Sequence, residues 1–247
     1  DGVLLNNYSR KQKFIIGFEP SNAINNIKNK KIIKINHFFN SKNAKIFKKK
    51  YGYAKVITIT NVFAHVDNIR DFTEGLKIIS NENTVIVIEF PYLIEMIKNI
   101  YFDLIYHEHL SYLSLLPLKK LFKEFDLKIF DVEKLKIGAS GPALRIFVSR
   151  KNSNYNNSKR LNKYFLIEKK WGITKKNNYK NFGLKISNCK KQILKIISEL
   201  VKNKKKIGCF SAPAKGNTLL NYLKISNKTI NFVAENNPKK INKYTPG

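Results

Sequence analysis

Four neighbouring residues, Tyr106, His107, Glu108 and His109, form the densest group of chemically active side chains in the sequence. A histidine titrates near neutral pH, with an ordinary pKa of about 6.5, and can remove a proton as a general base. A neighbouring carboxylate can hold the histidine ring in one tautomer. The segment follows a predicted strand, and loops on a rigid scaffold commonly carry catalytic groups. Base catalysis is therefore the first hypothesis for these residues.

Metal binding is the alternative hypothesis, because two histidines separated by one residue can chelate a metal ion. Glu108 is the only further ligand nearby, and no cysteine or third histidine follows at ligand spacing. The residues alone leave base catalysis and metal binding both open, although we expect no metal site in this chain.

Polar residues that could hold a nucleoside cofactor follow two predicted strands. Glu19 ends the first of them, and a carboxylate in this place can accept both hydroxyls of a ribose. Asn61 and His65 follow another strand, although His65 could equally bond the start of the next helix. Asp1 and Gly2 could let the backbone approach a cofactor, or could be a surface turn.

Lys215 and Asn217 lie in a loop of small residues, 211–217, between a predicted strand and a helix that we expect to start near Thr218. The start of a helix offers backbone N–H groups to a phosphate, and the lysine adds a cation. The same composition also suits a tight strand-to-helix connection. Substrate binding and simple packing stay equally open for this loop.

Short β-branched runs alternate with amphipathic helical patterns over the first 150 residues, which predicts an α/β fold with a parallel sheet flanked by helices. The unbroken apolar run 84–90 predicts a strand buried on both faces. A predicted antiparallel pair around 138–142 closes this sheet. The expected strands are 14–19, 32–35, 56–60, 84–90, 127–132 and 144–148.

A stretch rich in Asn, Ser and Lys, residues 151–160, predicts a linker between two domains. The predicted domains are residues 1–150 and residues 161–247. In the second, a long helix precedes a strand at 206–210, a helix and a strand at 230–234, which indicates a smaller Rossmann-like α/β domain. Residues 92–112 are expected to be an aromatic-rich connection within the first domain.

Lysine dominates the composition, and 47 basic residues against 17 acidic ones give a formal net charge of +30. Such a charge could mark a nucleic-acid surface. The lysines are spread along the whole chain, however, and occur with many asparagines and isoleucines, whose codons are also A/T-rich. Only five arginines occur, although arginine is best suited to read bases and clamp phosphates. We expect no specific nucleic-acid partner.

No segment approaches the roughly 18 consecutive apolar residues of a membrane span, so we expect no membrane attachment. The two cysteines, Cys189 and Cys209, provide neither a disulfide framework nor a zinc site, which favours a cytoplasmic protein. The sequence starts without methionine and stops in a turn-like phrase at Tyr244–Gly247. We therefore expect an interior fragment of a longer chain.

A series of short sequence motifs (phrases) in a fixed order resembles those of the S-adenosylmethionine-dependent sugar C-methyltransferase family, which builds branched deoxysugars on dTDP carriers. The resemblance spans the whole chain. It departs from the family at 138–142, where Gly-Ala-Ser-Gly-Pro replaces a His-Gly-Gly-Ser phrase, and in the absence of an N-terminal zinc-binding domain. The phrases are Gly17–Ser21, Asn61–His65, Glu89–Leu93, Tyr106–Tyr112, Ala212–Thr218 and Tyr244–Gly247.

The resemblance implies a Rossmann-like class I methyltransferase sheet that binds S-adenosylmethionine, and zinc only in the domain that is missing here. It implies a 4-keto-6-deoxy sugar on a nucleoside diphosphate as substrate. His109 would remove a proton beside the ketone, Glu108 would orient or charge-balance the histidine, and Tyr106 could donate to the enolate oxygen. The implied cofactor residues are Asp1, Gly2, Glu19, Asn61 and His65, and the implied substrate residues are Lys215 and Asn217.

Two other functions remain as alternatives. One is a nucleotide-binding relative without catalysis, against which the presence of Tyr106, Glu108 and His109 speaks. The other is a basic RNA-associated methyltransferase or binding module, whose RNA affinity would fall steeply with salt.

Overall fold

The computed structural model describes residues 2–8, 12–138 and 141–245, which divide into two compact units. Unit 1 holds the chain up to residue 90, residues 115–134 and residues 144–165. Unit 2 holds residues 91–114, 135–143 and 166–247. The chain thus passes between the units several times, and the units do not follow the predicted domain order. The predicted linker 151–160 lies inside unit 1.

The N-terminal part of unit 1 is a small parallel pair of strands. Strand β1 (Ile15–Phe18) pairs with β2 (Ile32–Ile35) in the register Ile15 to Ile32. Helix α1 (Val3–Asn6) precedes β1, and the short helix η1 (Asn22–Asn26) joins the two strands. The sequence predicted that these strands belong to one larger sheet, but they form a two-stranded sheet of their own.

The main sheet contains β3 (Val56–Thr60), β4 (Val85–Pro91), β6 (Gly141–Arg150) and β5 (Leu127–Gly138), in that spatial order. Strands β3 and β4 are parallel. Two residues separate β5 from β6, which only an antiparallel pair can span, so the predicted closing hairpin is present. Both of its strands are longer than the sequence pattern indicated, and the turn residues 139–140 lie outside the described residues.

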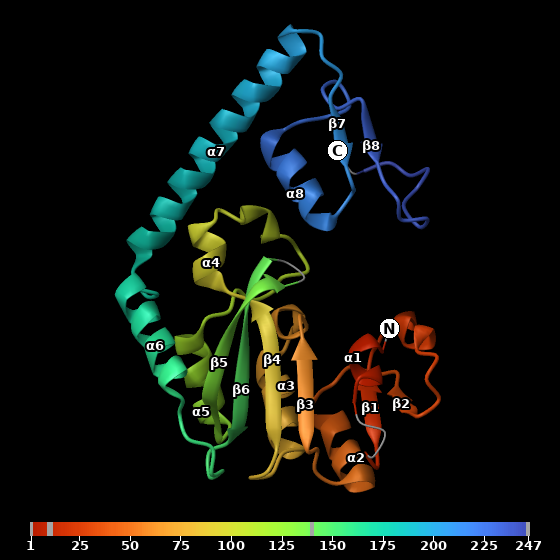
Figure 1. Cartoon of the computed structure of the whole chain (residues 1–247), viewed down its shortest axis with the longest axis vertical. Coiled ribbons are helices and arrows are strands. Elements are labelled where there is room, and N and C mark those ends of the chain that lie inside the picture. Colours follow the sequence, from red (N-terminus) through yellow and green to blue (C-terminus); the bar gives the residue numbers. More distant parts are fainter. Residues whose placement is uncertain (1, 9–11, 139–140, 246–247) are drawn as a thin grey trace. The chain divides into compact units, whose positions relative to one another are not determined.

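One face of β4 forms the centre of the core of unit 1. Ile86, Ile88 and Phe90 are fully buried, whereas Val85 and Val87, which alternate with them, are half-buried. Helices α3 (Ile69–Ile78) and α5 (Leu115–Glu124) lie behind the sheet in Figure 1. The other face of the strand carries Val85, Val87 and Glu89, none of which is exposed. The structure therefore agrees with the prediction of a strand covered on both faces, although the face of Ile86, Ile88 and Phe90 is covered more completely.

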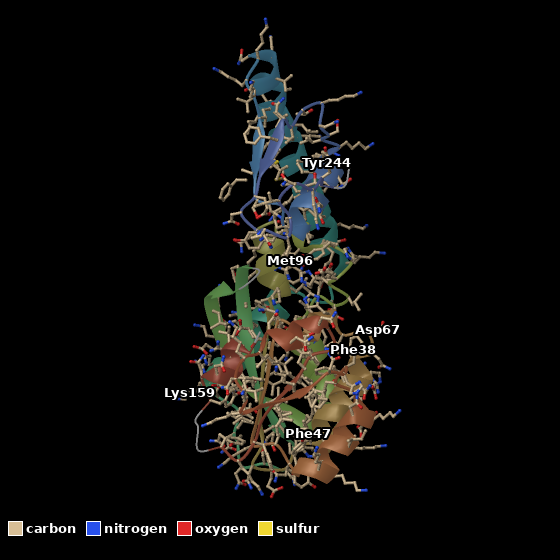
Figure 2. The ribbon with its side chains drawn as sticks, turned by 90° about the vertical axis from the view of Figure 1, so that its right-hand side faces the viewer. Phe38, Phe47, Asp67, Met96, Lys159 and Tyr244 are labelled. Atoms are coloured by element: carbon tan, nitrogen blue, oxygen red, sulfur yellow. The ribbon has the colours of Figure 1, made fainter. Side chains whose placement is uncertain are left out.

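Aromatic rings join these helices to the strands. Phe63, in the short helix η2 (Phe63–His65), contacts Phe72 of α3 and Phe122 of α5, with ring centroids 5.6 and 6.0 Å apart. A second cluster surrounds Phe47 of α2 (Ser41–Tyr51), which is labelled in Figure 2. This cluster includes Phe18 of β1, so it fixes the small sheet against α2.

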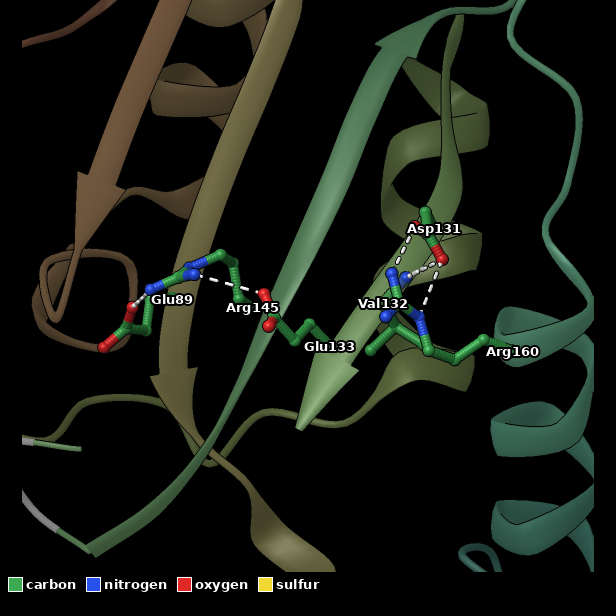
Figure 3. Close-up of polar contacts among 6 residues, drawn as sticks. All are labelled: Glu89, Asp131, Val132, Glu133, Arg145 and Arg160. Carbon is green, nitrogen blue, oxygen red and sulfur yellow. Dashed lines mark hydrogen bonds and ion pairs between the residues drawn. The ribbon is translucent and has the colours of Figure 1, made fainter. Parts of the chain in front are cut away.

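An ion-pair cluster holds the start of helix α6 (Lys159–Trp171) against β5 (Figure 3). Asp131 accepts hydrogen bonds from the Ser158 hydroxyl, the Arg160 guanidinium and the Val132 N–H. Burial alone would raise the pKa of Asp131, but the hydrogen bonds from Arg160 and Ser158 lower the pKa below its ordinary value. The cluster positions the chain as it leaves the main sheet.

Unit 2 combines a central segment with the C-terminal part of the chain. The central segment contains α4 (Leu93–Lys98) and the short helix η3 (Phe102–Leu104), where the sequence predicted only a connection. Helix α7 (Lys176–Lys202) is followed by β7 (Gly208–Phe210), α8 (Ala214–Leu223) and β8 (Phe232–Ala234). Strands β7 and β8 are parallel, which confirms the predicted β-α-β pattern.

The helices in the described part of the chain lack the combination of length and apolar composition that a membrane crossing requires.

Gly75 sits where α3 approaches the residues before α2. A Cβ atom at Gly75 would lie 2.9 Å from Cε1 of Phe39 and 3.1 Å from the backbone carbon of Asn40. Alanine is favoured over glycine in an exposed helix by about 1 kcal/mol. Here we expect Gly75→Ala to lower the free energy of unfolding by about 1 to 3 kcal/mol, because the added methyl group overpacks the contact. Urea unfolding followed by circular dichroism measures the change.

Gly183 of α7 is the matched control, because no atom lies within 4 Å of a Cβ added there. Gly183→Ala should leave stability unchanged or raise it by up to about 1 kcal/mol. A Gly75→Ala variant as stable as Gly183→Ala would contradict the close approach at Gly75.

Candidate functional site

The segment that carries Tyr106 to His109 is fixed at both ends within unit 2. At its start, the Tyr101 N–H donates to the Met96 carbonyl oxygen at 2.9 Å, which ties η3 to α4. At its end, Leu113 forms a bridge with Tyr92, and its carbonyl oxygen accepts from the Leu93 N–H at 3.1 Å. The segment is therefore a loop with anchored ends, which limits where its side chains can move.

His109 is the most enclosed side chain of the group, with only 9% of its surface exposed. Its Nδ1 lies 2.7 Å from the carbonyl oxygen of Leu104. A carbonyl oxygen can only accept, so Nδ1 carries the hydrogen in this contact. A neutral ring in this tautomer has its lone pair on Nε2, and a general base needs such a lone pair. The backbone of η3 thus sets the tautomer of His109.

Tyr106 packs against His109, with ring centroids 4.6 Å apart, and its carbonyl oxygen accepts from the His109 N–H at 3.0 Å. Burial raises the pKa of the Tyr106 hydroxyl above its ordinary value, and the charge and hydrogen bond of Glu108 raise it further. The hydroxyl is therefore protonated at neutral pH and can donate a hydrogen bond. His107 and Glu108 are exposed on the surface of the loop.

Tyr112 is a further aromatic residue beside His109, and the sequence did not single it out for a role. Its ring lies 6.4 Å from that of His109, at an interplanar angle of 75°. Burial raises the pKa of its hydroxyl, and the neighbouring Tyr106 contributes in the same direction. Two protonated phenols therefore flank the histidine.

In unit 1, Glu19 directly follows β1, at the carboxyl end of that strand. Its Oε1 accepts from the Ser21 N–H at 2.9 Å, and its own N–H donates to the Ile35 carbonyl oxygen. Hydrogen bonds from the side chain and the backbone of Ser21 lower the pKa of Glu19. The side chain is thus an ionised acceptor at the position that suits a ribose.

Asn61 directly follows β3, and its backbone has a positive φ of 53°. Its N–H donates to the carbonyl oxygen of Glu89, so the turn after β3 lies against the end of β4. His65 ends η2, is half-buried, and donates from its backbone to Val62. Both residues therefore lie at the carboxyl side of β3, as the sequence indicated.

Gly2 has a positive φ of 77° at the start of α1, a backbone conformation that residues other than glycine rarely adopt. A Cβ there would also lie 3.1 Å from the side chain of Ile27. Asp1, the other residue predicted at this place, lies outside the described residues.

The carboxyl end of β4 carries an ion-pair network that the sequence did not point to. Arg145 of β6 lies between Glu89 of β4 and Glu133 of β5, with nitrogen–oxygen distances of 3.1 Å to each (Figure 3). The Glu89 side chain is only 12% exposed. The only sign of this network in the sequence was an acidic residue, Glu89, inside an apolar strand. Its partner Arg145 is distant in sequence, so the pairing itself could not be predicted.

Lys215 and Asn217 belong to helix α8 and not to the loop before it, which corrects the predicted helix start near Thr218. The helix begins at Ala214 because Pro213 at its N-cap has the fixed φ that suits a helix start. Lys215 is exposed, and Asn217 is half-buried.

Glu235, after β8, holds the loop in front of α8. Its carboxylate accepts from the N–H groups of Ala212, Asn236 and Asn237. The bonds to Ala212 and Asn237 lower the pKa of Glu235. This carboxylate orders the connection from β7 to α8, so the loop has a structural support of its own.

The predicted residues thus fall into three groups. Tyr106, Glu108 and His109 form one contacting cluster, while Lys215 and Asn217 lie on α8 in the same unit. Gly2, Glu19, Asn61 and His65 belong to unit 1. Across residues 2–8, 12–138 and 141–245, no three histidine, cysteine, aspartate or glutamate side chains gather as a metal site requires.

Comparison with known proteins gave two adjacent family matches. A model described as a methyltransferase domain matches residues 1–132, and a model described as a C-methyltransferase C-terminal domain matches residues 138–247. Among curated proteins, C-methyltransferase NovU of Streptomyces niveus is 25% identical over 234 residues, which are 94% of this chain. The chain spans 55% of the length of that relative.

Two solved structures are also similar. A SAM-dependent methyltransferase from Anabaena variabilis has a TM-score of 0.43 at 14% identity, over 56% of this chain and 68% of that one. Magnesium protoporphyrin IX methyltransferase from Synechocystis, with bound SAH, has a TM-score of 0.38 at 8% identity, over 56% and 64%.

Arg145→Met removes the cation beside the buried Glu89 carboxylate. Loss of one partner from a fully buried pair costs about 3 to 5 kcal/mol, and the Arg145 side chain is 36% exposed. We therefore expect Arg145→Met to lower the free energy of unfolding by about 1 to 3 kcal/mol. The double variant Glu89→Gln with Arg145→Met should recover part of the loss. Urea unfolding at pH 7 compares the variants.

Arg70→Met is the matched control, because the side chains of the pair Arg70–Glu124 are 62% and 39% exposed. Its loss should cost at most about 1 kcal/mol. An Arg145→Met variant that is no less stable than Arg70→Met would show that the network contributes nothing to the fold.

Proposed function

Because the chain belongs to the methyltransferase family, we propose that it is part of an S-adenosylmethionine-dependent C-methyltransferase. The match of its C-terminal half to a C-methyltransferase domain supports carbon as the methylated atom. We propose as substrate a keto sugar carried on a nucleoside diphosphate of the dTDP type. The observation that carries this proposal is the hydrogen bond from Nδ1 of His109 to the Leu104 carbonyl.

Carbon methylation beside a ketone needs a base, because a C–H bond is not nucleophilic until its proton is removed. The tautomer of His109 provides the lone pair on Nε2 that takes this proton. The electrons of the C–H bond then form an enolate, and its carbon forms the new bond to the methyl group. When bound, the cofactor would supply an electrophilic methyl group on a sulfonium, whose methyl–sulfur bond breaks with its electron pair staying on sulfur as a neutral thioether. The proton stays on His109 until solvent removes it.

Tyr106 is suited to stabilise the enolate oxygen. Its raised pKa keeps the hydroxyl protonated at neutral pH, so that it can donate to the charge that develops on the oxygen. Before substrate binds, Glu108 accepts the single hydrogen of this hydroxyl, and in the proposed step that hydrogen turns from Glu108 to the enolate oxygen. In this proposal Glu108 acts on Tyr106, and the Leu104 carbonyl takes the orienting role at the histidine.

The residues of unit 1 fit the proposed cofactor. The ionised carboxylate of Glu19 has about four lone-pair sites, of which the backbone and the side chain of Ser21 use two, so it can also accept the ribose hydroxyls. We assign Asn61 and His65 to the same cofactor because they follow the carboxyl end of β3. Asp1 and Gly2 complete the proposed cofactor residues.

Lys215 and Asn217 are the proposed contacts of the substrate diphosphate, because they lie in the first turn of α8. The exposed ammonium group of Lys215 adds the cation that such an anion attracts. The two unpaired cysteines are consistent with a reducing cytoplasm, which we propose as the location.

His109→Asn should lower the turnover number by about 10²- to 10⁴-fold, the usual contribution of a positioned base. The affinity for substrate should change little, because proton removal belongs to the transition state. The decisive measurement is exchange of the proton beside the ketone with deuterated water, followed by NMR without methyl donor. The exposed neighbour provides the control, since His107→Asn should keep most of the exchange rate. Exchange at the wild-type rate in His109→Asn would exclude His109 as the base.

Glu19→Gln should weaken binding of S-adenosylmethionine by about 10-fold or more, because charge-assisted hydrogen bonds contribute roughly 1.5 to 3 kcal/mol. Calorimetric titration with the cofactor measures the change. Glu82→Gln, a change in an exposed turn before β4, is the control and should bind as tightly as wild type. Equal affinity in both variants would remove Glu19 from the cofactor site.

A further inference from the structure

Helix η3 supplies the carbonyl group that fixes His109, yet it has only three residues. Such a short helix has little stability of its own, because helix nucleation is costly. Its position must therefore come from its side chains. Phe102 and Leu104 are 8% and 4% exposed, and they belong to one hydrophobic cluster with α4 and α7, which also contacts Leu219 of α8.

Tyr222 of α8 provides a direct contact to η3. Its ring lies 5.1 Å from the ring of Phe102 at an interplanar angle of 63°, an edge-to-face pair. On the α7 side, Lys190 places its ammonium group 4.6 Å from the centre of the Tyr222 ring. The same ammonium group donates to the carbonyl oxygen of Tyr222 at 2.5 Å. Tyr222 is thus held by α7 while it contacts η3.

We infer that Tyr222 is a positioning residue for the base, because it contacts Phe102 and thereby holds the Leu104 carbonyl in line with Nδ1 of His109. The inference rests on the proposed function of His109. All residues of this chain of contacts, from Lys190 to His109, belong to unit 2. The C-terminal part of the chain therefore sets the tautomer of a histidine that lies more than a hundred residues earlier.

The chemical consequence follows from the two nitrogens of the ring. If η3 shifts, Nδ1 loses its acceptor, and the neutral ring also populates the tautomer with hydrogen on Nε2. That tautomer cannot accept a proton at Nε2. Small displacements of supporting groups can lower rates by roughly 10²-fold.

The first test reads the tautomer directly and does not depend on activity. Histidine labelled with ¹⁵N gives signals whose positions distinguish a protonated from an unprotonated ring nitrogen. The chain has only four histidines, and His109→Asn identifies the signal of His109. We expect wild type to show hydrogen on Nδ1 of His109, and Tyr222→Ala to show a mixture of tautomers. The signals of His37 and His65 should stay unchanged, which would show that unit 1 is intact.

The controls separate positioning from folding. Tyr222→Phe keeps the ring and should keep the wild-type tautomer and rate. Tyr244→Ala removes a fully exposed tyrosine of the same unit and should have no effect (Figure 2). Lys190→Met removes only the support of Tyr222 and should produce a smaller shift in the same direction. Because Lys190 is a partly exposed residue on the long helix α7, this variant remains informative if Tyr222→Ala does not fold.

The second test measures exchange of the proton beside the ketone. Tyr222→Ala should lower the exchange rate by about 10- to 100-fold while the affinity for S-adenosylmethionine stays unchanged. An unchanged His109 signal in both Tyr222→Ala and Lys190→Met would overturn the inference. A wild-type protein with the expected tautomer but no exchange would instead overturn the proposed function, so the two failures are distinguishable.

Discussion

The proposed chemistry depends on one hydrogen bond, from Nδ1 of His109 to the carbonyl oxygen of Leu104. A carboxylate partner would carry charge and could itself accept the proton that His109 is proposed to remove. A backbone carbonyl does neither, so it fixes the tautomer without competing for the proton. Its direction is set by the path of the backbone, which makes the conformation of η3 part of the site. The anchored loop ends, the buried Phe102 and the contact with Tyr222 all serve that conformation.

The second constraint is the scarcity of carboxylates in a chain with a net charge of +30. Several of the few acidic residues hold together segments that are distant in sequence. Glu89 joins β4 to Arg145, Asp131 joins β5 to the start of α6, and Glu235 orders the loop before α8. Glu19 is the exception, because its carboxylate accepts hydrogen bonds from Ser21, only two residues away. A carboxylate with local support only is the one best able to accept a further ligand.

The regular elements of the sheets could be read from the sequence, because each depends on local patterns. Strands β2 and β3 have the predicted bounds. Helices α4 and η3 were missed because they have only six and three residues, too few to show a helical repeat, and because packing in unit 2 orders them. The ion pairs of Arg145 were missed because they join three strands, which no local pattern records.

The sequence also predicted which residue types form the candidate site, but it did not predict the contacts that hold these residues in place. A histidine beside a carboxylate suggested that Glu108 orients or charge-balances His109, whereas the contact at Nδ1 of His109 is with a backbone carbonyl, which has no signature in the sequence. The family matches divide the chain near residue 135, and they assign the His109 segment to the methyltransferase domain. The compact units instead place this segment with the C-terminal part. The C-terminal domain that sequence comparison separates from His109 therefore packs against helix η3, whose Leu104 carbonyl contacts Nδ1 of that histidine.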